Sequence, residues 1–435
     1  MLHNKDESLG KEELRALQFS RLKETVERVF HLVPFYQKKF DELGITPHDI
    51  NTLEDIQKLP FTKKQDLRDN YPFGMFSVEM DQIVRIHSSS GTTGKPTVVG
   101  YTESDMNVWT EVMGRVFTMG GVTSKDILQN STGYGLFTGG LGFHTAAEKM
   151  KIAVVPSSTG FTSRQLLLLK DFGATAITGT PSFALHMAEV ATKEGYDIKK
   201  DFKLKTGFFG AEPASKGLKE EISKLWGIDY HEVYGLSEII GPGVASSCKH
   251  SERLHIQEDH FYPEIIDPQT GEVLPEGERG ELVITTITKQ GLPIIRYRTG
   301  DITSIVRTPC RCGRTLGRIE SIVGRSDDML VINGVNVFPS QIEHVLSTCS
   351  GVTLNYQIIA KKKGYLDKLE VDVEMDESMM VDDVSKLENL KKHIQHEMLN
   401  NLYINVNIKL VAPKSIQRSE GKAVRVIDKR KEDEN

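Results

Sequence analysis

A short loop of small polar residues offers the clearest chemistry in the sequence. Residues 88–96 read SSSGTTGKP and follow an apolar run at 83–86 that predicts a strand. Glycines leave the backbone N–H groups of such a loop accessible, and the hydroxyl groups add further donors. Lys95 adds a positive charge, so the loop can bind an anion such as a phosphate group. A flexible connector between two strands is the alternative that the loop alone leaves open.

This loop differs from the P-loop of phosphotransferases. A P-loop has four residues between its glycines and Ser or Thr after its lysine, whereas here two threonines separate the glycines and Pro96 follows Lys95. Pro96 also disfavours the helix N-terminus on which a P-loop places its phosphate. We therefore expect phosphate binding without P-loop chemistry.

Several further motifs accompany the loop. They are GAEP (210–213), YGLSE (234–238), YRTGD (297–301), GRSDD (324–328) and GK (421–422). In this order, and together with the loop, they resemble the adenylate-forming superfamily of acyl-CoA synthetases, adenylation domains and luciferases. The segments YGLFTGGLGFH (134–144), DHFYPEIIDP (259–268) and NGVNVFPSQIE (333–343) are similar to phenylacetate–CoA ligases. The resemblance covers about residues 10–430.

The resemblance implies a nucleotide site. Glu212 and Pro213 would line the adenine, on which Tyr234 would stack, and Glu232 would approach its exocyclic amine. Asp301 would accept hydrogen bonds from the ribose hydroxyls. The full set implied to surround ATP or AMP is Ser89, Ser90, Gly91, Thr92, Thr93, Gly94, Lys95, Gly210, Ala211, Glu212, Pro213, Glu232, Tyr234, Gly235, Ser237, Asp301 and Arg325.

The same resemblance implies three catalytic residues, Thr93, Glu238 and Lys422. Thr93 would hold the β- and γ-phosphates, and the Glu238 carboxylate would bind Mg²⁺. Lys422 would bridge the substrate carboxylate and the α-phosphate. A carboxylate that attacks a triphosphate brings two anions together, so a lysine and Mg²⁺ must offset the charge. Read without the resemblance, Glu238 is an ordinary helix-start residue and Lys422 an ordinary surface lysine.

The implied reaction has two steps. The enzyme would activate a phenylacetate-type aryl acid with ATP to an acyl-adenylate and release pyrophosphate, then transfer the acyl group to CoA and release AMP. Lys422 and the phosphate loop would lie in different domains, so the domains must close, and Asp327 would be the hinge. An enzyme that loads a carrier protein, and a non-catalytic nucleotide-binding relative, are the alternatives.

Five apolar residues border the acyl site that the resemblance implies. Aromatic and β-branched walls would favour a flat apolar acyl group, although ordinary core packing explains each residue equally well. These residues are Tyr134, Phe137, Phe143, Ile239 and Ile240.

Three of the four cysteines fall in two short segments. Cys248 precedes His255 in CKHSERLH, and Cys310 and Cys312 flank one arginine. Three cysteines and one histidine are a common set of zinc ligands, so a structural zinc site that ties two loops together is one interpretation. Free thiols are the other, because Cys-x-Cys is less typical than Cys-x-x-Cys and His250 competes with His255.

The elements that must position these residues alternate between β-rich and helical runs. This alternation predicts an α/β fold with mixed or parallel sheets flanked by helices. Strands punctuated by Gly and Pro at 256–305 predict a β-rich subdomain. We expect a large N-terminal domain at 1–326 that binds ATP and the acid, and a mobile α+β C-terminal domain at 327–435 that carries the catalytic lysine, joined by the hinge.

Composition limits the classes of function. A chain of 435 residues exceeds what one core usually serves, and its net charge of −6 argues against nucleic-acid binding. The sequence lacks a membrane-length apolar run and a signal peptide, and four cysteines form no disulfide framework. We expect a cytoplasmic enzyme whose partners are a carboxylic acid, ATP and CoA, with a homodimer suggested by the resemblance.

Overall fold

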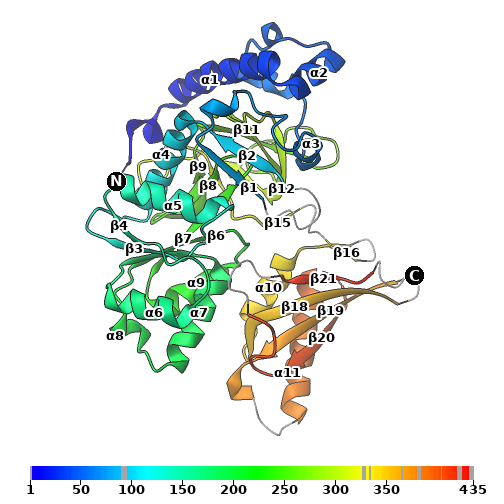
Figure 1. Ribbon diagram of the computed structural model, residues 1–435. Coiled ribbons are helices and arrows are strands. Elements are labelled where there is room, and N and C mark those ends of the chain that lie inside the picture. Colours follow the sequence, from blue (N-terminus) through cyan, green and yellow to red (C-terminus); the bar gives the residue numbers. More distant parts are fainter. Residues whose placement is uncertain are drawn as a thin grey trace.

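The chain folds into a large N-terminal domain and a smaller C-terminal domain in the computed structural model (Figure 1). The structure describes residues 2–89, 96–325, 330–332, 335–363, 366–379, 384–402, 404–418 and 424–430. Helices flank the sheets of the N-terminal domain, and the C-terminal domain packs helices on a separate sheet. This arrangement confirms the predicted α/β class with an α+β C-terminal part.

The main sheet of the N-terminal domain is mixed. In the described residues it has nine strands, in the order β13 (Ile305–Val306), β14 (Arg318–Ile319), β9 (Ser251–Ile256), β8 (Gly241–Cys248), β7 (Asp229–Leu236), β6 (Thr206–Gly210), β5 (Ala176–Gly179), β3 (Ile127–Asn130) and β4 (Ala153–Val155). From β7 to β4 the pairs are parallel, and from β7 to β13 they are antiparallel. Helical crossovers connect the parallel half, whereas a tight hairpin joins β8 to β9 and reverses the chain.

Helices surround the parallel half of this sheet. They are α4 (Glu103–Met119), α5 (Thr138–Lys149), α6 (Thr162–Asp171), α7 (Pro181–Lys193), α8 (Ile198–Asp201) and α9 (Lys216–Trp226). Helix α9 shows why the sequence folds in this way: Leu218, Ile222 and Trp226 recur every fourth residue and are buried, with polar residues between them. Ser215 caps the helix by accepting a hydrogen bond from the backbone N–H of Leu218.

Two smaller sheets complete the N-terminal domain. One is an antiparallel pair, β1 (Arg85–Ser88) and β2 (Val98–Tyr101), and the other has the order β10 (Phe261–Ile266), β11 (Gly280–Thr286), β12 (Tyr297–Thr303) and β15 (Gly324–Arg325). The preceding residues form helices and 3₁₀ turns, which are η1 (Lys5–Ser8), α1 (Lys11–Leu32), α2 (Pro34–Leu43), η2 (Pro47–Asp49), η3 (Leu53–Lys58), α3 (Lys64–Asp69) and η4 (Met80–Gln82).

The C-terminal domain is built on a four-stranded sheet in the order β20, β19, β18, β21. Its elements are β16 (Leu330–Ile332), β17 (Val335–Val337), α10 (Pro339–Thr348), β18 (Val352–Lys363), β19 (Leu366–Met375), η5 (Glu377–Met379), α11 (Val384–Leu402), β20 (Val406–Val411) and β21 (Val426–Asp428). Helix α10 packs against α9, which brings the two domains together.

Within the described part of the chain, no helix has both the length and the apolar character that crossing a bilayer requires.

Candidate active site

The base of the phosphate loop is fixed by two strands. Strands β1 and β2 pair up to Ser88 and Val98, and the Ser89 N–H then donates to the Thr97 carbonyl at 3.0 Å. The Thr97 N–H donates back to the Ser89 hydroxyl, also at 3.0 Å. A strand therefore stands on each side of the loop, as predicted. The rest of the predicted phosphate site, Ser90, Gly91, Thr92, Thr93, Gly94 and Lys95, lies outside the described residues.

Three motifs meet at Asp301. The Tyr234 hydroxyl donates to Asp301 Oδ2 at 2.6 Å, and Arg325 Nη1 donates to Oδ1 at 3.2 Å. These residues, which we call the Asp301 cluster, come from β7, β12 and β15. Asp301 is buried, and burial raises the pKa of Tyr234 well above its usual value, so its hydroxyl stays protonated and can donate.

Glu238 lies beside Thr97, at the base of the loop. Its side chain is buried, and Oε1 accepts a hydrogen bond from the Thr97 hydroxyl at 3.2 Å. Lys64 Nζ is 3.8 Å from the same oxygen. A carboxylate in this position has the chemistry required of a Mg²⁺ ligand.

Lys289 is a residue of this region that motif reasoning missed. Its ammonium is buried, donates to the Glu238 carbonyl at 3.1 Å and lies 4.9 Å from the centre of the Tyr101 ring. Burial lowers the pKa of Lys289 to about 8. The signal in the sequence is a lone lysine inside a mostly uncharged run at 282–295, which suits a buried position.

A cavity of about 540 Å³ opens beside the loop base. Helices α5 and α7 both begin at its wall, and helix N-termini carry partial positive charge that favours anions. The lining residues are Ser89, Ser131, Thr132, Gly133, Phe137, Thr138, Gly139, Phe143, Thr159, Gly179, Thr180, Phe183, Gly210, Ala211, Val233, Gly235, Leu236, Ser237 and Pro242.

The cavity contains only part of the predicted acid pocket. Phe137 and Phe143 line it, whereas Tyr134 is not among its lining residues. The Tyr134 hydroxyl instead shares a hydrogen bond with the His144 ring. Ile239 and Ile240 are not among the cavity's lining residues either, and both are buried in the main hydrophobic core. Their backbone N–H groups donate to the Leu236 carbonyl in a tight turn, which directs the side chains inward. Phe183 lines the cavity and was missed.

Backbone packing accounts for two motif glycines. A Cβ atom on Gly210 would lie 2.1 Å from the Val233 carbonyl oxygen, and one on Gly235 would lie 2.0 Å from that of Gly241. Ala211 follows with φ of +70°, a left-handed conformation that is strained for alanine. The tight backbone of this cavity wall therefore requires small residues.

Of the other predicted nucleotide residues, some line the cavity and others lie outside its lining. Ser237 lines the cavity and shares a hydrogen bond with the Thr138 hydroxyl at 3.1 Å. Glu212 accepts from the Ser182 N–H at 2.6 Å, at the start of α7, and Pro213 beside it is exposed.

Glu232 lies in a different cavity, of about 1010 Å³. Its carboxylate is paired with Lys219 and accepts from the Ser321 hydroxyl at 2.7 Å. Successive strand residues point to opposite faces, which separates Glu232 from its neighbour Val233 in the first cavity. The position of Glu232 therefore does not support the predicted contact with adenine.

One arginine forms ion pairs in both domains. Arg418 donates to both oxygens of Glu374 at 2.8 Å within the C-terminal domain, and to both oxygens of Glu189 on α7 at 3.1 Å. We call these three residues the Arg418 clasp. Nearby, Glu343 accepts from the Ser215 N–H at 2.8 Å. The predicted hinge and catalytic lysine, Asp327 and Lys422, lie outside the described residues.

The predicted cysteine and histidine ligands come together. The candidate ligand atoms of Cys248, His255, Cys310 and Cys312, the Cys₃His cluster, all lie within 4.8 Å of one another. The competing His250 contributes a backbone N–H, which donates to the Cys248 sulfur at 3.4 Å. Cys349, in contrast, is buried among apolar residues, as expected of a small core side chain.

Comparison with known proteins agrees with this arrangement. Residues 36–288 match the family model described as AMP-binding enzyme, and residues 334–430 match that of the AMP-binding enzyme C-terminal domain. The chain belongs to the AMP-binding enzyme family. A phenylacetate-coenzyme A ligase of Thermus thermophilus is 45% identical to this chain over 98% of each protein.

Solved structures add information on the arrangement of the domains. A 2-hydroxyisobutyryl-CoA ligase in the postadenylation state, in complex with 2-HIB-AMP, is 30% identical, and the match covers 98% of this chain and 92% of that one with a TM-score of 0.93. The same ligase in complex with 2-HIB-AMP and CoA, in the thioesterification state, gives a TM-score of 0.72 at the same coverage. The present domain arrangement therefore resembles the postadenylation state.

Proposed function

We propose that the chain is an AMP-forming acid–CoA ligase that activates an arylacetic acid of the phenylacetate type. The position of the 540 Å³ cavity carries this proposal, because its aromatic walls, with Phe137, Phe143 and Phe183, adjoin the phosphate loop base at Ser89. An acid whose ring occupies this cavity presents its carboxylate to the α-phosphate of ATP. The likeness to phenylacetate-coenzyme A ligases supports the same class of acid.

The first half-reaction forms the acyl-adenylate. A carboxylate oxygen attacks the α-phosphorus, and the bond from that phosphorus to pyrophosphate breaks. Asp301 holds the ribose, Thr92, Thr93 and Lys95 hold the outer phosphates, and Lys422 bridges the two reacting anions. Glu238 would hold Mg²⁺, which would supply positive charge against the negative charge that builds up in this step. The buried hydrogen bond from Thr97 keeps the Glu238 carboxylate oriented toward the loop.

The second half-reaction uses a different arrangement of the domains. The CoA sulfur attacks the acyl carbon, a thioester bond forms, and AMP leaves with the bonding electrons. The C-terminal domain, residues 327–435, rotates about Asp327 relative to residues 1–326 and withdraws Lys422. The two states of the 2-hydroxyisobutyryl-CoA ligase support this alternation.

An acid panel tests the proposal. Pyrophosphate release and CoA thioester formation are measured in parallel with phenylacetate, benzoate, indoleacetate, propionate and hexanoate. We expect phenylacetate to give the highest kcat/KM in both assays. Absence of acid-dependent pyrophosphate with every aryl acid would disprove the ligase activity. Pyrophosphate release without a CoA thioester would instead indicate an enzyme that loads another thiol, such as a carrier protein.

A single methyl group tests whether the acid occupies this cavity. Gly139 lines the cavity on α5, and a Cβ atom there would meet only Thr132, at 3.8 Å, so alanine fits the fold. The added methyl group fills space that an aromatic ring needs. Gly139→Ala should lower kcat/KM for phenylacetate about tenfold or more, since one methyl group changes discrimination by roughly 1–3 kcal/mol. Propionate is the internal control, and equal losses for both acids would place the ring elsewhere.

A further inference from the structure

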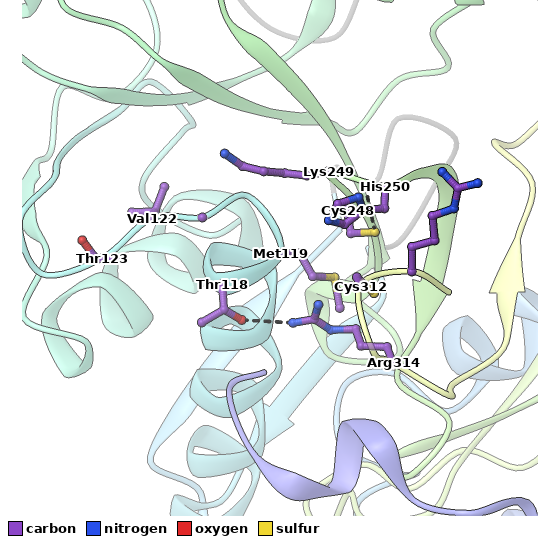
Figure 2. Close-up of a pocket in the computed structure, with 11 residues that line it drawn as sticks. Thr118, Met119, Val122, Thr123, Cys248, Lys249, His250, Cys312 and Arg314 are labelled. Atoms are coloured by element: carbon purple, nitrogen blue, oxygen red, sulfur yellow. Dashed lines mark hydrogen bonds between the residues drawn. The ribbon is translucent and has the colours of Figure 1, made fainter. Parts of the chain in front are cut away.

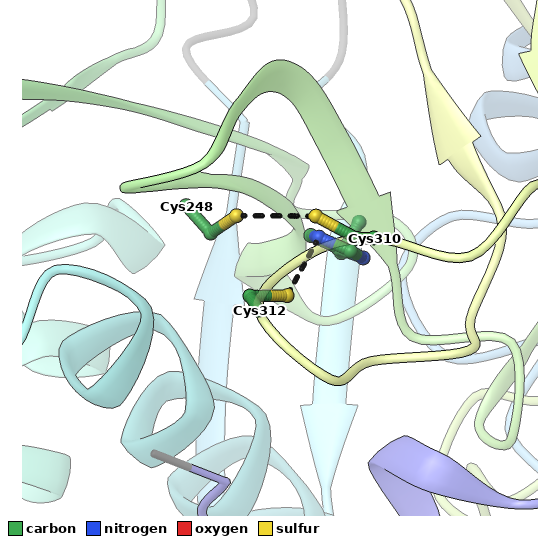
Figure 3. Close-up of side chains that lie close together, drawn as sticks. Cys248, Cys310 and Cys312 are labelled. Carbon is green, nitrogen blue, oxygen red and sulfur yellow. Dashed lines mark hydrogen bonds between the residues drawn. The ribbon is translucent and has the colours of Figure 1, made fainter.

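Four side chains outside the catalytic region converge on one point. Cys248 ends β8 and His255 lies on β9, while Cys310 and Cys312 belong to the irregular loop between β13 and β14. Figure 3 shows the three cysteines with their sulfurs turned toward a common centre. The Cys248 and Cys310 sulfurs are 3.8 Å apart, and the Cys312 sulfur is 3.5 Å from His255 Nε2.

These separations match the edges of a zinc tetrahedron. Zn–S bonds of about 2.3 Å and Zn–N bonds of about 2.05 Å at tetrahedral angles place two sulfurs about 3.8 Å apart, and a sulfur and a nitrogen about 3.6 Å apart. The observed distances are 3.8 and 3.5 Å. A disulfide would need sulfurs about 2.05 Å apart, so the Cys248–Cys310 separation does not describe one.

Local structure explains why the four residues face each other. Strands β8 and β9 pair around a tight turn, with Ser246 opposite His255 and Cys248 opposite Ser251. In the loop, the Gly313 N–H donates to the Cys310 carbonyl at 3.0 Å, and Gly313 has φ of +89°, which glycine adopts readily. This turn folds the Cys-x-Cys segment back on itself.

The surroundings also favour a metal. His255 is buried, and among the described residues the Cys312 sulfur is the hydrogen-bond partner of its Nε2, while Nδ1 has none. A buried imidazole with one weak partner is costly, and a metal bond at Nε2 would replace that weak contact. Met119 packs against Cys248 and Cys310 and closes one side with an apolar surface.

A second group of possible ligands in the described residues provides a contrast. Glu111, Asp259 and His260 also lie close together. However, both oxygens of Asp259 accept hydrogen bonds from Arg115 at 2.8 Å, and Arg115 also pairs with Glu111. A guanidinium therefore already supplies the positive charge there, whereas no such cation is bound to the Cys₃His cluster in the hydrogen bonds and ion pairs of the described chain.

We propose that the Cys₃His cluster binds one Zn²⁺ ion with a structural role. Four protein ligands complete a tetrahedron and leave no position open for a substrate, which is typical of structural sites. The metal would join the β8–β9 hairpin to a loop that lacks regular structure. This site is separate from the proposed ligase chemistry and stands or falls independently of it.

Zinc at this position would also fix the start of the chain. The Cys-x-Cys loop continues to Arg314, which is buried and paired with the buried Glu7 carboxylate. The Thr315 hydroxyl donates to the Leu9 carbonyl at 2.7 Å. Figure 2 shows Arg314 between the cysteines and the end of α4, where it contacts Thr118 at 3.4 Å. Loss of the metal should therefore loosen the N-terminal segment as well as the loop.

Metal analysis of the purified full chain tests the proposal. Inductively coupled plasma mass spectrometry after gel filtration should find about one zinc per chain in the wild type and in Cys349→Ser, which removes the cysteine outside the cluster. Cys312→Ser and His255→Ala should lose most of the zinc. Cobalt(II) substitution of the wild type should give the intense visible absorption and thiolate charge-transfer bands of a tetrahedral thiolate site.

Measurements on the wild-type chain keep the test independent of variant folding. A thiol-modifying mercurial should release zinc in proportion to three modified cysteines, and limited proteolysis should then cut the N-terminal segment faster. Wild-type protein that contains no zinc and takes up none, a Cys248–Cys310 disulfide by mass spectrometry, bound iron instead of zinc, or full zinc content in Cys312→Ser would each overturn the proposal.

Discussion

The Asp301 cluster and the Arg418 clasp are both made of charged hydrogen bonds, but the first connects strands of one domain and the second connects two domains. Tyr234, Asp301 and Arg325 all belong to the N-terminal domain, and Asp301 and Arg325 are direct partners on neighbouring strands. The clasp joins the two domains, and its Glu189 side chain is 35% exposed. An ion pair that water can reach contributes little to stability and can exchange partners.

We therefore distinguish a fixed half of the site, the Asp301 cluster within the N-terminal domain, from a removable half, which the C-terminal domain contributes. Neighbouring strands hold the Asp301 cluster in place in the absence of substrate, so the proposed binding of a ribose would need little reorganisation. The clasp, in contrast, joins side chains of two domains, so its contacts to Glu189 are lost if the domains separate. We infer that the nucleotide site is rigid and that the choice between the half-reactions is made at the domain contact.

The largest effect should follow from removing the positive charge of Lys422, which belongs to the removable half. Lys422→Ala should slow acyl-adenylate formation roughly 10³-fold, since loss of one preorganised charge in a transition state has effects of this order. Thioester formation from supplied phenylacetyl-adenylate should persist. Lys429→Ala, which removes an exposed lysine from the same region, is the control. Equal loss of both half-reactions would contradict a removable half.

The next largest effect should follow from a substitution of Asp301 in the fixed half. Asp301→Ala leaves the Tyr234 hydroxyl and the Arg325 guanidinium without this buried acceptor and removes the proposed ribose contact. We expect the Kd for ATP to rise roughly 100-fold, from about 2–3 kcal/mol of lost charged hydrogen bonding. Isothermal titration calorimetry measures this change, and the exposed Asp171→Asn is the control. An unchanged Kd would exclude Asp301 from the nucleotide site.

A smaller effect concerns the free energy of unfolding, which the burial of Lys289 in the N-terminal domain lowers. Burial lowers the pKa of Lys289 to about 8, below the usual 10.5 of the unfolded chain, so the fold disfavours the charged form. This cost is complete below pH 8 and is relieved as the pH rises from 8 to 10.5. Wild type should therefore gain about 2 kcal/mol of unfolding free energy relative to Lys289→Met between about pH 7 and about pH 9.5.

Urea unfolding at the two pH values checks the sign of this dependence. The matched control is Lys149→Met, because Lys149 is exposed and its substitution should show no such dependence on pH. If Lys289→Met and Lys149→Met respond alike, Lys289 titrates in the fold as it does in water.

The smallest effect should come from the clasp. Arg418→Ala removes the bidentate contacts to Glu189 and should shift the domain equilibrium roughly tenfold away from the present arrangement, which corresponds to about 1.4 kcal/mol. The rate of adenylation relative to thioester formation should fall by that factor. Arg430→Ala is the control, because Arg430 pairs with Asp428 and Asp367 inside the C-terminal domain. A constant ratio would mean that other contacts hold the domains.

Local sequence signals predicted much of the fold. Helix α10, Pro339–Thr348, has the bounds that its pattern indicates, because proline starts it and its apolar spacing is regular. The antiparallel half of the main sheet was harder to predict, since a run such as GPGVASSC alternates weakly and its pairing depends on distant strands.

The site residues likewise fall into those that local motifs indicate and those that depend on tertiary packing. Motifs indicated Asp301 and Glu238, whose neighbours the structure then supplies. The direction of a side chain in a turn or strand is set by tertiary packing, so the motifs alone do not show that Ile239 lies in the hydrophobic core and Glu232 in a second cavity. Arg418 and Glu189 are 229 residues apart, and no local pattern relates them. Lys289 was missed because a lone lysine carries no periodic signal.

The buried pair of Glu7 and Arg314 has a consequence for how the protein is made. The two residues are 307 positions apart, so the first turn of the chain cannot reach its final place until most of the polypeptide has left the ribosome. At about 5–20 residues per second, this delay is of the order of 15–60 s. Throughout that time the N-terminal segment is available to chaperones and proteases. It can dock only after the loop at 307–317 has folded.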